Sequence, residues 1–279
     1  MCRWLAYTGA PLRLHSLLFE AQNSLINQSL ACQRGSVATN GDGFGVGWYG
    51  TQDKPGLYRD IRPAWNDDNL RSLAEQIEAR LFFAHVRAST GTPTTRQNCH
   101  PFRHGNWLFM HNGRIGGYDK VRRDLEFRIA PHLYNDRIGT TDSEIIFLLL
   151  LGNGLFTDPA DAYRRTIADI ESAMQANGVT EPLRLTACVT DGQTLHAIRY
   201  SSDNSAPTLF YAQGQEVQVE NGACHFPCGT GAVLVLSEPL DRDDACWNEV
   251  PEGYFLTASA HRVALEPVMV REAKISAVA

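Results

Sequence analysis

The segment MCRWLAYTG, residues 1–9, decides how the rest of the chain is interpreted. Bulky apolar side chains at Trp4, Leu5 and Tyr7 suit a β-strand over residues 1–8. A strand that begins at the terminus ties the first residues into a sheet and keeps them from fraying. We therefore expect the first residues of the chain to be held in place.

Cys2 brings two reactive groups together if Met1 is removed, as methionine aminopeptidases do before small residues. A thiol with a pKa of about 8.5 is only a few per cent thiolate at neutral pH. The exposed α-amine, which titrates near about 7.7, could accept the thiol proton directly or through one water. One residue would then supply both nucleophile and general base. A cysteine at position 2 can also be an ordinary residue, so the segments downstream must decide.

Composition narrows the class of protein. The chain has 279 residues, 43% of them hydrophobic, and a net charge of −6, so we expect neither a nucleic acid nor a membrane surface as a partner. No apolar run approaches the roughly 18 residues of a membrane span, and no secretory pattern follows Arg3. These features predict a cytoplasmic protein. Its seven cysteines then indicate thiols, not a disulfide framework.

Apolar periodicity predicts the remaining elements. We expect a helix over residues 13–23, a buried helix that starts near Thr141 and Asp142 and stops at Gly152, and an amphipathic helix over Asp161–Asn177. Residues 183–200 predict a hairpin that turns at Asp191 and Gly192. The other predicted strands are 43–50, 79–89, 106–113, 232–236, 254–258 and 263–270.

The order of these elements favours one fold class. Strands come first, then two helices, then strands, with few βαβ alternations, which favours an α+β layered sandwich over a doubly wound parallel sheet. No repeat or linker interrupts the sequence, so we expect a single domain over residues 1–279.

Several segments occur in a fixed order: MCRWLAYTG at the start, NGDGFGVGWY at 40–49, FAHVRAST at 83–90, NCHPF at 98–102, WLFMHNG at 107–113 and TTDSE at 140–144. Together they resemble the class II glutamine amidotransferases of the N-terminal-nucleophile hydrolase superfamily. The resemblance implies a four-layer αββα sandwich of two antiparallel sheets. It also implies that Cys2 attacks the γ-amide of glutamine or of a small γ-glutamyl compound and forms a thioester.

The resemblance assigns roles to four more residues. Asn112 would donate its side-chain N–H, and Gly113 its backbone N–H, to the oxyanion. Arg87 would pair with the α-carboxylate of the glutamyl group, and Asp142 would receive its α-ammonium. Taken without the resemblance, Asn112 and Gly113 suit a hairpin turn, and Asp142 suits a helix N-cap.

The sequence departs from the family pattern in two places. Many members have an Arg-Gly pair where this chain has Asn40 and Gly41, and Arg34 is a candidate substitute for that arginine. Synthases of the family often read Trp-Ala-Thr-His where this chain has Ala88, Ser89 and Thr90, which argues against an ammonia tunnel. We expect no cofactor and no metal, because Cys224 and Cys228 have no second pair of ligands nearby.

Three functions are consistent with this pattern. The first is a glutaminase or γ-glutamyl amide hydrolase that releases glutamate from a small-molecule substrate. The second is a glutaminase subunit that supplies ammonia to a separate synthase. The third is a catalytically silent glutamine-binding or assembly protein, which would follow if Met1 is retained and blocks the α-nitrogen of Cys2. A synthase partner or a homo-oligomer is left open.

Overall fold

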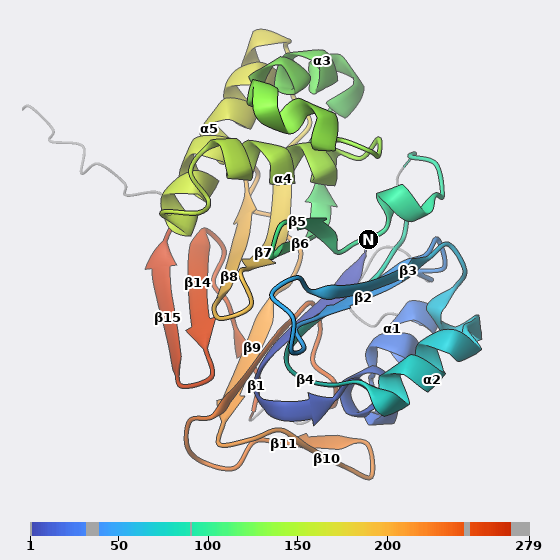
Figure 1. Ribbon diagram of the computed structural model, residues 1–279. Helices are drawn as coiled ribbons and strands as arrows, with labels where there is room; N and C mark the ends of the chain where they lie inside the picture. Colours follow the sequence, from blue (N-terminus) through green and yellow to red (C-terminus); the bar gives the residue numbers. More distant parts are fainter. Residues whose placement is uncertain (1, 32–38, 90, 243–245, 269–279) are drawn as a thin grey trace, which may run out of the picture.

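The fold consists of two antiparallel sheets stacked face to face, with helices on both outer faces (Figure 1). The computed structural model describes residues 2–31, 39–89, 91–242 and 246–268. The layers run α3–α5, six-stranded sheet, seven-stranded sheet, α1 and α2. This is the α+β, αββα sandwich expected from the sequence.

The seven-stranded sheet has β1 near its middle, in the order β13-β9-β12-β1-β4-β2-β3. Its strands are β1 Arg3–Arg13, β2 Phe44–Trp48, β3 Gly56–Asp60, β4 Glu78–Val86, β9 Phe210–Gly214, β12 Ala232–Leu236 and β13 Asn248–Glu249. Side chains of β1 alternate between two apolar layers, with Trp4 and Ala6 facing the other sheet and Leu5 and Tyr7 facing the helices. The strand that begins beside Cys2 is therefore buried on both faces.

The six-stranded sheet has the order β15-β14-β8-β7-β6-β5. Its strands are β5 Phe102–His104, β6 Trp107–Arg114, β7 Arg184–Thr190, β8 Leu195–Ser201, β14 Tyr254–Ser259 and β15 Arg262–Pro267, and a separate hairpin pairs β10 Gln218–Glu220 with β11 Ala223–His225. The predicted hairpin over 183–200 is confirmed as β7 and β8. In its turn the Asp191 carboxylate accepts the backbone N–H groups of Gln193 and Thr194.

Helices cover the outer face of each sheet. The α-helices are α1 Leu25–Leu30, α2 Asp68–Gln76, α3 Tyr118–Arg128, α4 Asp142–Gly152 and α5 Pro159–Ala176. Short helical turns lie at Ser16–Glu20, Ala64–Asn66, Arg96–Asn98 and Pro131–Asp136. Helix α4 is apolar all round, because it packs on β6 on one side and under α3 and α5 on the other. None of the helices in the described ranges is long and apolar enough to cross a membrane.

The prediction of a helix over residues 13–23 is confirmed only in part, because residues 14–20 alone are helical. β1 continues to Arg13 after an irregularity between Thr8 and Leu12, and its end pairs with the start of β4. Helical residues follow directly at Leu14 and His15 and continue as the π-helical turn Ser16–Glu20. The leucines that suggested the helix, Leu14, Leu17 and Leu18, are buried within this helical segment, which is shorter than predicted.

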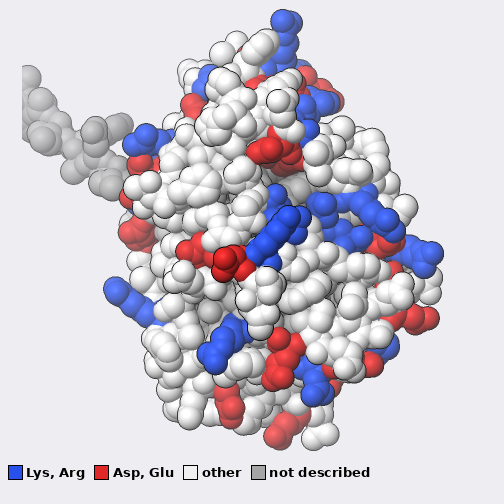
Figure 2. Space-filling model, in the orientation of Figure 1, with Lys and Arg blue, Asp and Glu red and all other residues white. Residues whose placement is uncertain are grey.

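Charged side chains of both signs are interspersed on the face shown in Figure 2. Apolar side chains fill the interior instead, where the two sheets meet through Trp4, Phe83, Leu108 and Met110. The site described below opens between these two sheets, so its depth is set by their packing.

Leu150 tests how much of the stability comes from the layer over α4. It is fully buried, so Leu150→Ala removes apolar burial and leaves a cavity, and we expect a loss of about 2–5 kcal/mol in the free energy of unfolding. Urea denaturation measures it. The matched control is Leu265→Ala, since that leucine on β15 is 37% exposed and should change stability by less than about 1 kcal/mol. Equal losses in both variants would contradict the assigned packing.

Candidate active site

Cys2 lies directly ahead of β1, between the ends of two neighbouring strands. In the β1–β4 register Arg3 faces Val86, which brings Cys2 beside Arg87 and Ala88. The Cys2 Sγ is 3.6 Å from the Ala88 carbonyl oxygen. Burial raises the pKa of the Cys2 thiol, while the Ala88 contact and the nearby guanidinium of Arg87 oppose that rise. The thiol therefore needs a base to become a nucleophile at neutral pH.

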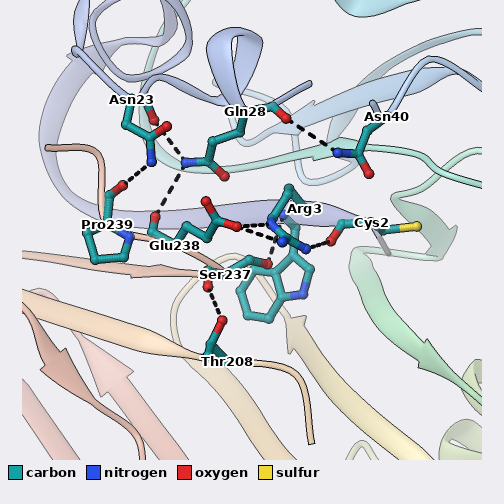
Figure 3. A network of polar contacts seen from close by, with 10 residues as sticks. Cys2, Arg3, Asn23, Gln28, Asn40, Thr208, Ser237, Glu238 and Pro239 are labelled. Carbon is teal, nitrogen blue, oxygen red and sulfur yellow. Dashed lines mark hydrogen bonds and ion pairs between the residues drawn. The ribbon is translucent and has the colours of Figure 1, made fainter. Parts of the chain in front are cut away.

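A buried ion pair holds the backbone of Cys2 in place (Figure 3). Arg3 Nε donates to Glu238 Oε1 at 2.6 Å, and Arg3 Nη1 donates to the Cys2 carbonyl at 2.8 Å. Arg3 and Glu238 are each only 1% exposed. Leu5 pairs with Leu236, and the same register continued brings Arg3 opposite Glu238. Sequence patterns did not predict this pair, because its partners are 235 positions apart.

Gln28 of α1, together with Asn23 and Asn40 outside that helix, extends this network (Figure 3). Gln28 Nε2 donates to the Asn23 carbonyl at 2.9 Å and approaches the Glu238 carbonyl at 3.4 Å. Asn23 Nδ2 donates to the Pro239 carbonyl at 2.6 Å, and Asn40 Nδ2 approaches the Gln28 carbonyl at 3.4 Å. The chain around Glu238 is thus held to α1 as well as to β1. Arg34, the candidate substitute arginine, lies outside the described residues; the guanidinium observed behind Cys2 is that of Arg3.

Asn112 and Gly113 belong to β6, in the other sheet. Asn112 pairs with Thr186 and Gly113 with Leu185 on β7, so the alternative of a hairpin turn is wrong. The Asn112 side chain is 1% exposed, and neither atom of its amide has a hydrogen-bond partner among the described residues. Leaving such a group unpaired costs about 1–3 kcal/mol. A buried amide at this position therefore suits a ligand that bonds to it.

Gly113 is required by a close approach of the backbone. A Cβ at this position would overlap the Arg184 carbonyl oxygen, and the φ of 154° is one that other residues rarely adopt. Any other residue would push β6 away from β7 next to Asn112.

Arg87 and Asp142 approach the same cavity from different elements. The Arg87 guanidinium is 3% exposed and donates to Thr92 Oγ1 at 2.7 Å and to the Asp42 carbonyl at 3.2 Å. Asp142 is the first residue of α4, and its Oδ2 accepts the Ile115 backbone N–H at 2.9 Å. The N-cap of α4 is Thr141, whose hydroxyl accepts the Glu144 N–H. The N-cap interpretation of Asp142 is therefore wrong.

One cavity collects all five residues predicted from the sequence. Its lining residues are Cys2, Arg87, Ala88, Ser89, Thr92, His100, His111, Asn112, Gly113, Arg114, Thr141, Asp142, Ser143 and Arg184. Sequence reasoning missed Arg114 and Arg184, which strand register brings to the cavity, and Ser143, which the first turn of α4 places there. Among the described residues, no group of three or more His, Cys, Asp or Glu side chains could hold a metal ion.

Three buried histidines support the floor of the cavity. The rings of His85 and His100 are 4.2 Å apart, and His111 Nδ1 is 2.9 Å from the Ser143 hydroxyl. Burial lowers the pKa of His85 to about 3, lowers that of His100 well below its usual value, and also lowers that of His111. All three are therefore neutral at pH 7. His100 is thus an ordered, neutral interior residue.

Two stacked antiparallel sheets, with a cysteine leading a central strand and an unpaired amide facing it from the other sheet, define an N-terminal-nucleophile type of amidohydrolase. Residues 14–274 match the family described as glutamine amidotransferases class-II, and the chain belongs to this family.

Particular relatives agree with this assignment. The "Probable glutamine amidotransferase DUG3" of Saccharomyces cerevisiae is 35% identical across 96% of this chain and 85% of its own length. The gamma-glutamyl-hercynylcysteine sulfoxide hydrolase of Mycolicibacterium smegmatis is 28% identical across 96% of this chain and 100% of its own. A solved structure, the glutamine aminotransferase class-II domain protein from Silicibacter pomeroyi, is 36% identical, with a TM-score of 0.72 over 96% of this chain and 100% of its own.

The buried histidines should make the protein less stable in mild acid. Their pKa values are lower in the folded state than the usual value of about 6.5, so below that pH the unfolded chain binds more protons. The free energy of unfolding should therefore fall as the pH drops from about 7 to 5, by up to about 1.4 kcal/mol per pH unit for each histidine. Urea titrations at several pH values measure the slope.

The variant His100→Asn should reduce that slope by about one histidine's share. His225 is exposed, so His225→Gln provides the matched control and should leave the slope unchanged. A slope that is identical in both variants would show that His100 is not kept neutral by burial.

Proposed function

We propose that this protein hydrolyses the γ-amide of glutamine or of a small γ-glutamyl compound through a thioester on Cys2. The observation that supports this most directly is the buried, unpartnered Asn112 amide in the same cavity as the Cys2 thiol. A glutaminyl carbonyl held between them could be attacked from one sheet and stabilised from the other. The described residues would act as one catalytic domain.

Met1 must be removed once, before catalysis, to expose the α-amine of Cys2. The α-amine of Cys2 then takes the thiol proton, and Sγ attacks the δ-carbonyl carbon of the glutamyl group. Asn112 Nδ2 and the Gly113 N–H donate to the resulting oxyanion. The C–N bond breaks, the departing amine takes the proton from the α-ammonium of Cys2, and water hydrolyses the thioester to release glutamate. The raised pKa of the thiol explains why a base is required.

Arg87 and Asp142 set the position of the substrate in this proposal. Arg87 would bind the α-carboxylate and Asp142 the α-ammonium, so that only a glutamyl chain length brings the δ-carbonyl to Cys2. The name of the mycobacterial relative supports a γ-glutamyl substrate for this chain as well. A partner synthase, a homo-oligomer and a cytoplasmic location stay predictions.

Processing of Met1 is the first test. Protein from its own cells should have an intact mass that lacks Met1 and should release glutamate from glutamine or γ-glutamyl amides. Cys2→Ala should abolish this release without unfolding the protein, and turnover should fall as the α-amine becomes protonated on the acid side of neutrality. Native protein that retains Met1 throughout, and is inactive, would instead support the glutamine-binding or assembly role.

The second test is the assigned oxyanion donor. Asn112→Ala should lower kcat roughly 10²–10³-fold with a much smaller change in KM, because the amide would act on the transition state. The matched control is Asn69→Ala, an exposed asparagine on α2, which should leave both constants unchanged. A change confined to KM would show that Asn112 binds the ground state and does not stabilise the oxyanion.

A further inference from the structure

Two arginines face each other across neighbouring strands at the rim of the cavity. Arg114 at the end of β6 is directly opposite Arg184 at the start of β7, and both line the cavity that contains Cys2. Like charges in directly opposed positions of a sheet are destabilising. The pair is thus a local cost to the fold, and a ligand of opposite charge would offset it.

Acidic groups in the protein satisfy this pair only in part. Asp203 accepts from Arg184 Nη2 at 2.6 Å and lies 3.4 Å from its Nε, but Nη1 has no hydrogen bond within the described ranges. Arg114 is exposed and forms no ion pair with any described residue. Glu181 is near Arg114, yet its pKa is lowered first by its own backbone N–H and then by Lys120, before Arg114 contributes. Some guanidinium N–H groups of Arg114 and Arg184 therefore remain able to bind a ligand at the rim of the cavity.

The charge balance of the cavity favours an anionic ligand. Its lining contains three guanidinium groups, those of Arg87, Arg114 and Arg184, and one carboxylate, that of Asp142. A glutamyl head group has one α-carboxylate and one α-ammonium, which Arg87 and Asp142 would match. Arg114, and the part of the Arg184 guanidinium that Asp203 does not bind, remain for another ligand. The part of the substrate beyond the scissile bond can supply the missing negative charge.

The position of the pair relative to the reacting atoms agrees with this. Arg114 directly follows Gly113, and the Arg184 carbonyl is packed against Gly113. Arg114 therefore extends from the segment assigned to the oxyanion and Arg184 from the strand beside it, whereas Arg87 follows β4 in the other sheet. A carboxylate carried by the leaving amine, close to the scissile carbon, would be within reach of such long side chains.

We propose that Arg114 and Arg184 form an anion-binding subsite that selects γ-glutamyl substrates whose leaving amine bears a carboxylate. This inference rests on the proposed function, because it divides the cavity into a glutamyl side and a leaving-group side. Planar guanidinium groups suit a carboxylate, which can accept two N–H donors at once. Free glutamine, whose leaving group is ammonia, makes no use of the subsite.

The test compares two ligands of nearly equal size, γ-glutamylglycine and γ-glutamylglycinamide, which differ only in the charge of the leaving group. Wild-type protein should prefer the acid roughly tenfold in kcat/KM at low ionic strength, and added salt should reduce the preference. Arg114→Gln and Arg184→Gln should each bring the ratio closer to one, and Arg184→Lys should retain part of it. Arg165→Gln, an exposed ion-paired arginine on α5, is the control and should keep the full ratio.

Three results would overturn the inference. Wild-type protein could show no preference, the Gln variants could keep the wild-type ratio, or they could weaken both substrates equally, which would mean that the pair binds the glutamyl α-carboxylate instead.

Calorimetry with Cys2→Ala protein separates the inference from the proposed function. Preferential binding of the acid without any wild-type turnover would sustain the subsite and refute the hydrolase. Turnover of both ligands at equal rates would do the reverse. Binding of neither ligand would overturn the subsite as well.

Discussion

The ion pair between Arg3 and Glu238 is the constraint on which the site depends. It is buried where β1 begins, and its guanidinium also holds the carbonyl of Cys2. Removing one partner of such a pair typically costs about 3–5 kcal/mol, because the other charge is left buried without compensation. A terminal residue would ordinarily fray. Here the β1 register and this pair together fix the backbone from which the thiol projects.

Several arrangements in the site lower the stability of the protein, and the rest of the fold offsets this loss. The Asn112 amide is buried without a partner, three histidines are kept neutral, and Arg114 faces Arg184. None of these arrangements stabilises the protein by itself. The surrounding apolar layers, above all the one around α4, supply the stability that lets a pocket of unsatisfied polar groups persist.

Sequence patterns predicted the elements whose burial is regular. β2, β6, α4 and α5 have continuous or periodic apolar runs, and each was predicted within a few residues. α2 and α3 were missed because each buries only two side chains, Leu70 and Ala74 in α2, and Val121 and Leu125 in α3. The mostly polar sequences of these two helices resemble those of loops. The five residues predicted from their motifs line one cavity. Arg184 was not predicted, because only the pairing of β7 with β6 brings it to that cavity.

The two halves of the site belong to different sheets, and few hydrogen bonds join them. Trp4 Nε1 donates to the Thr186 carbonyl at 3.3 Å, and His85 Nε2 is 3.2 Å from the His111 carbonyl. Apolar side chains such as Trp4, Phe83, Leu108 and Met110 fill much of the remaining space between the sheets. The distance between the Cys2 sulfur and the Asn112 amide therefore depends on the spacing of the two sheets. Any motion of one sheet relative to the other changes this distance. Such a motion would stop catalysis while the hydrogen bonds within each sheet stayed intact. Loss of activity would therefore report a change in the packing between the sheets before any loss of secondary structure.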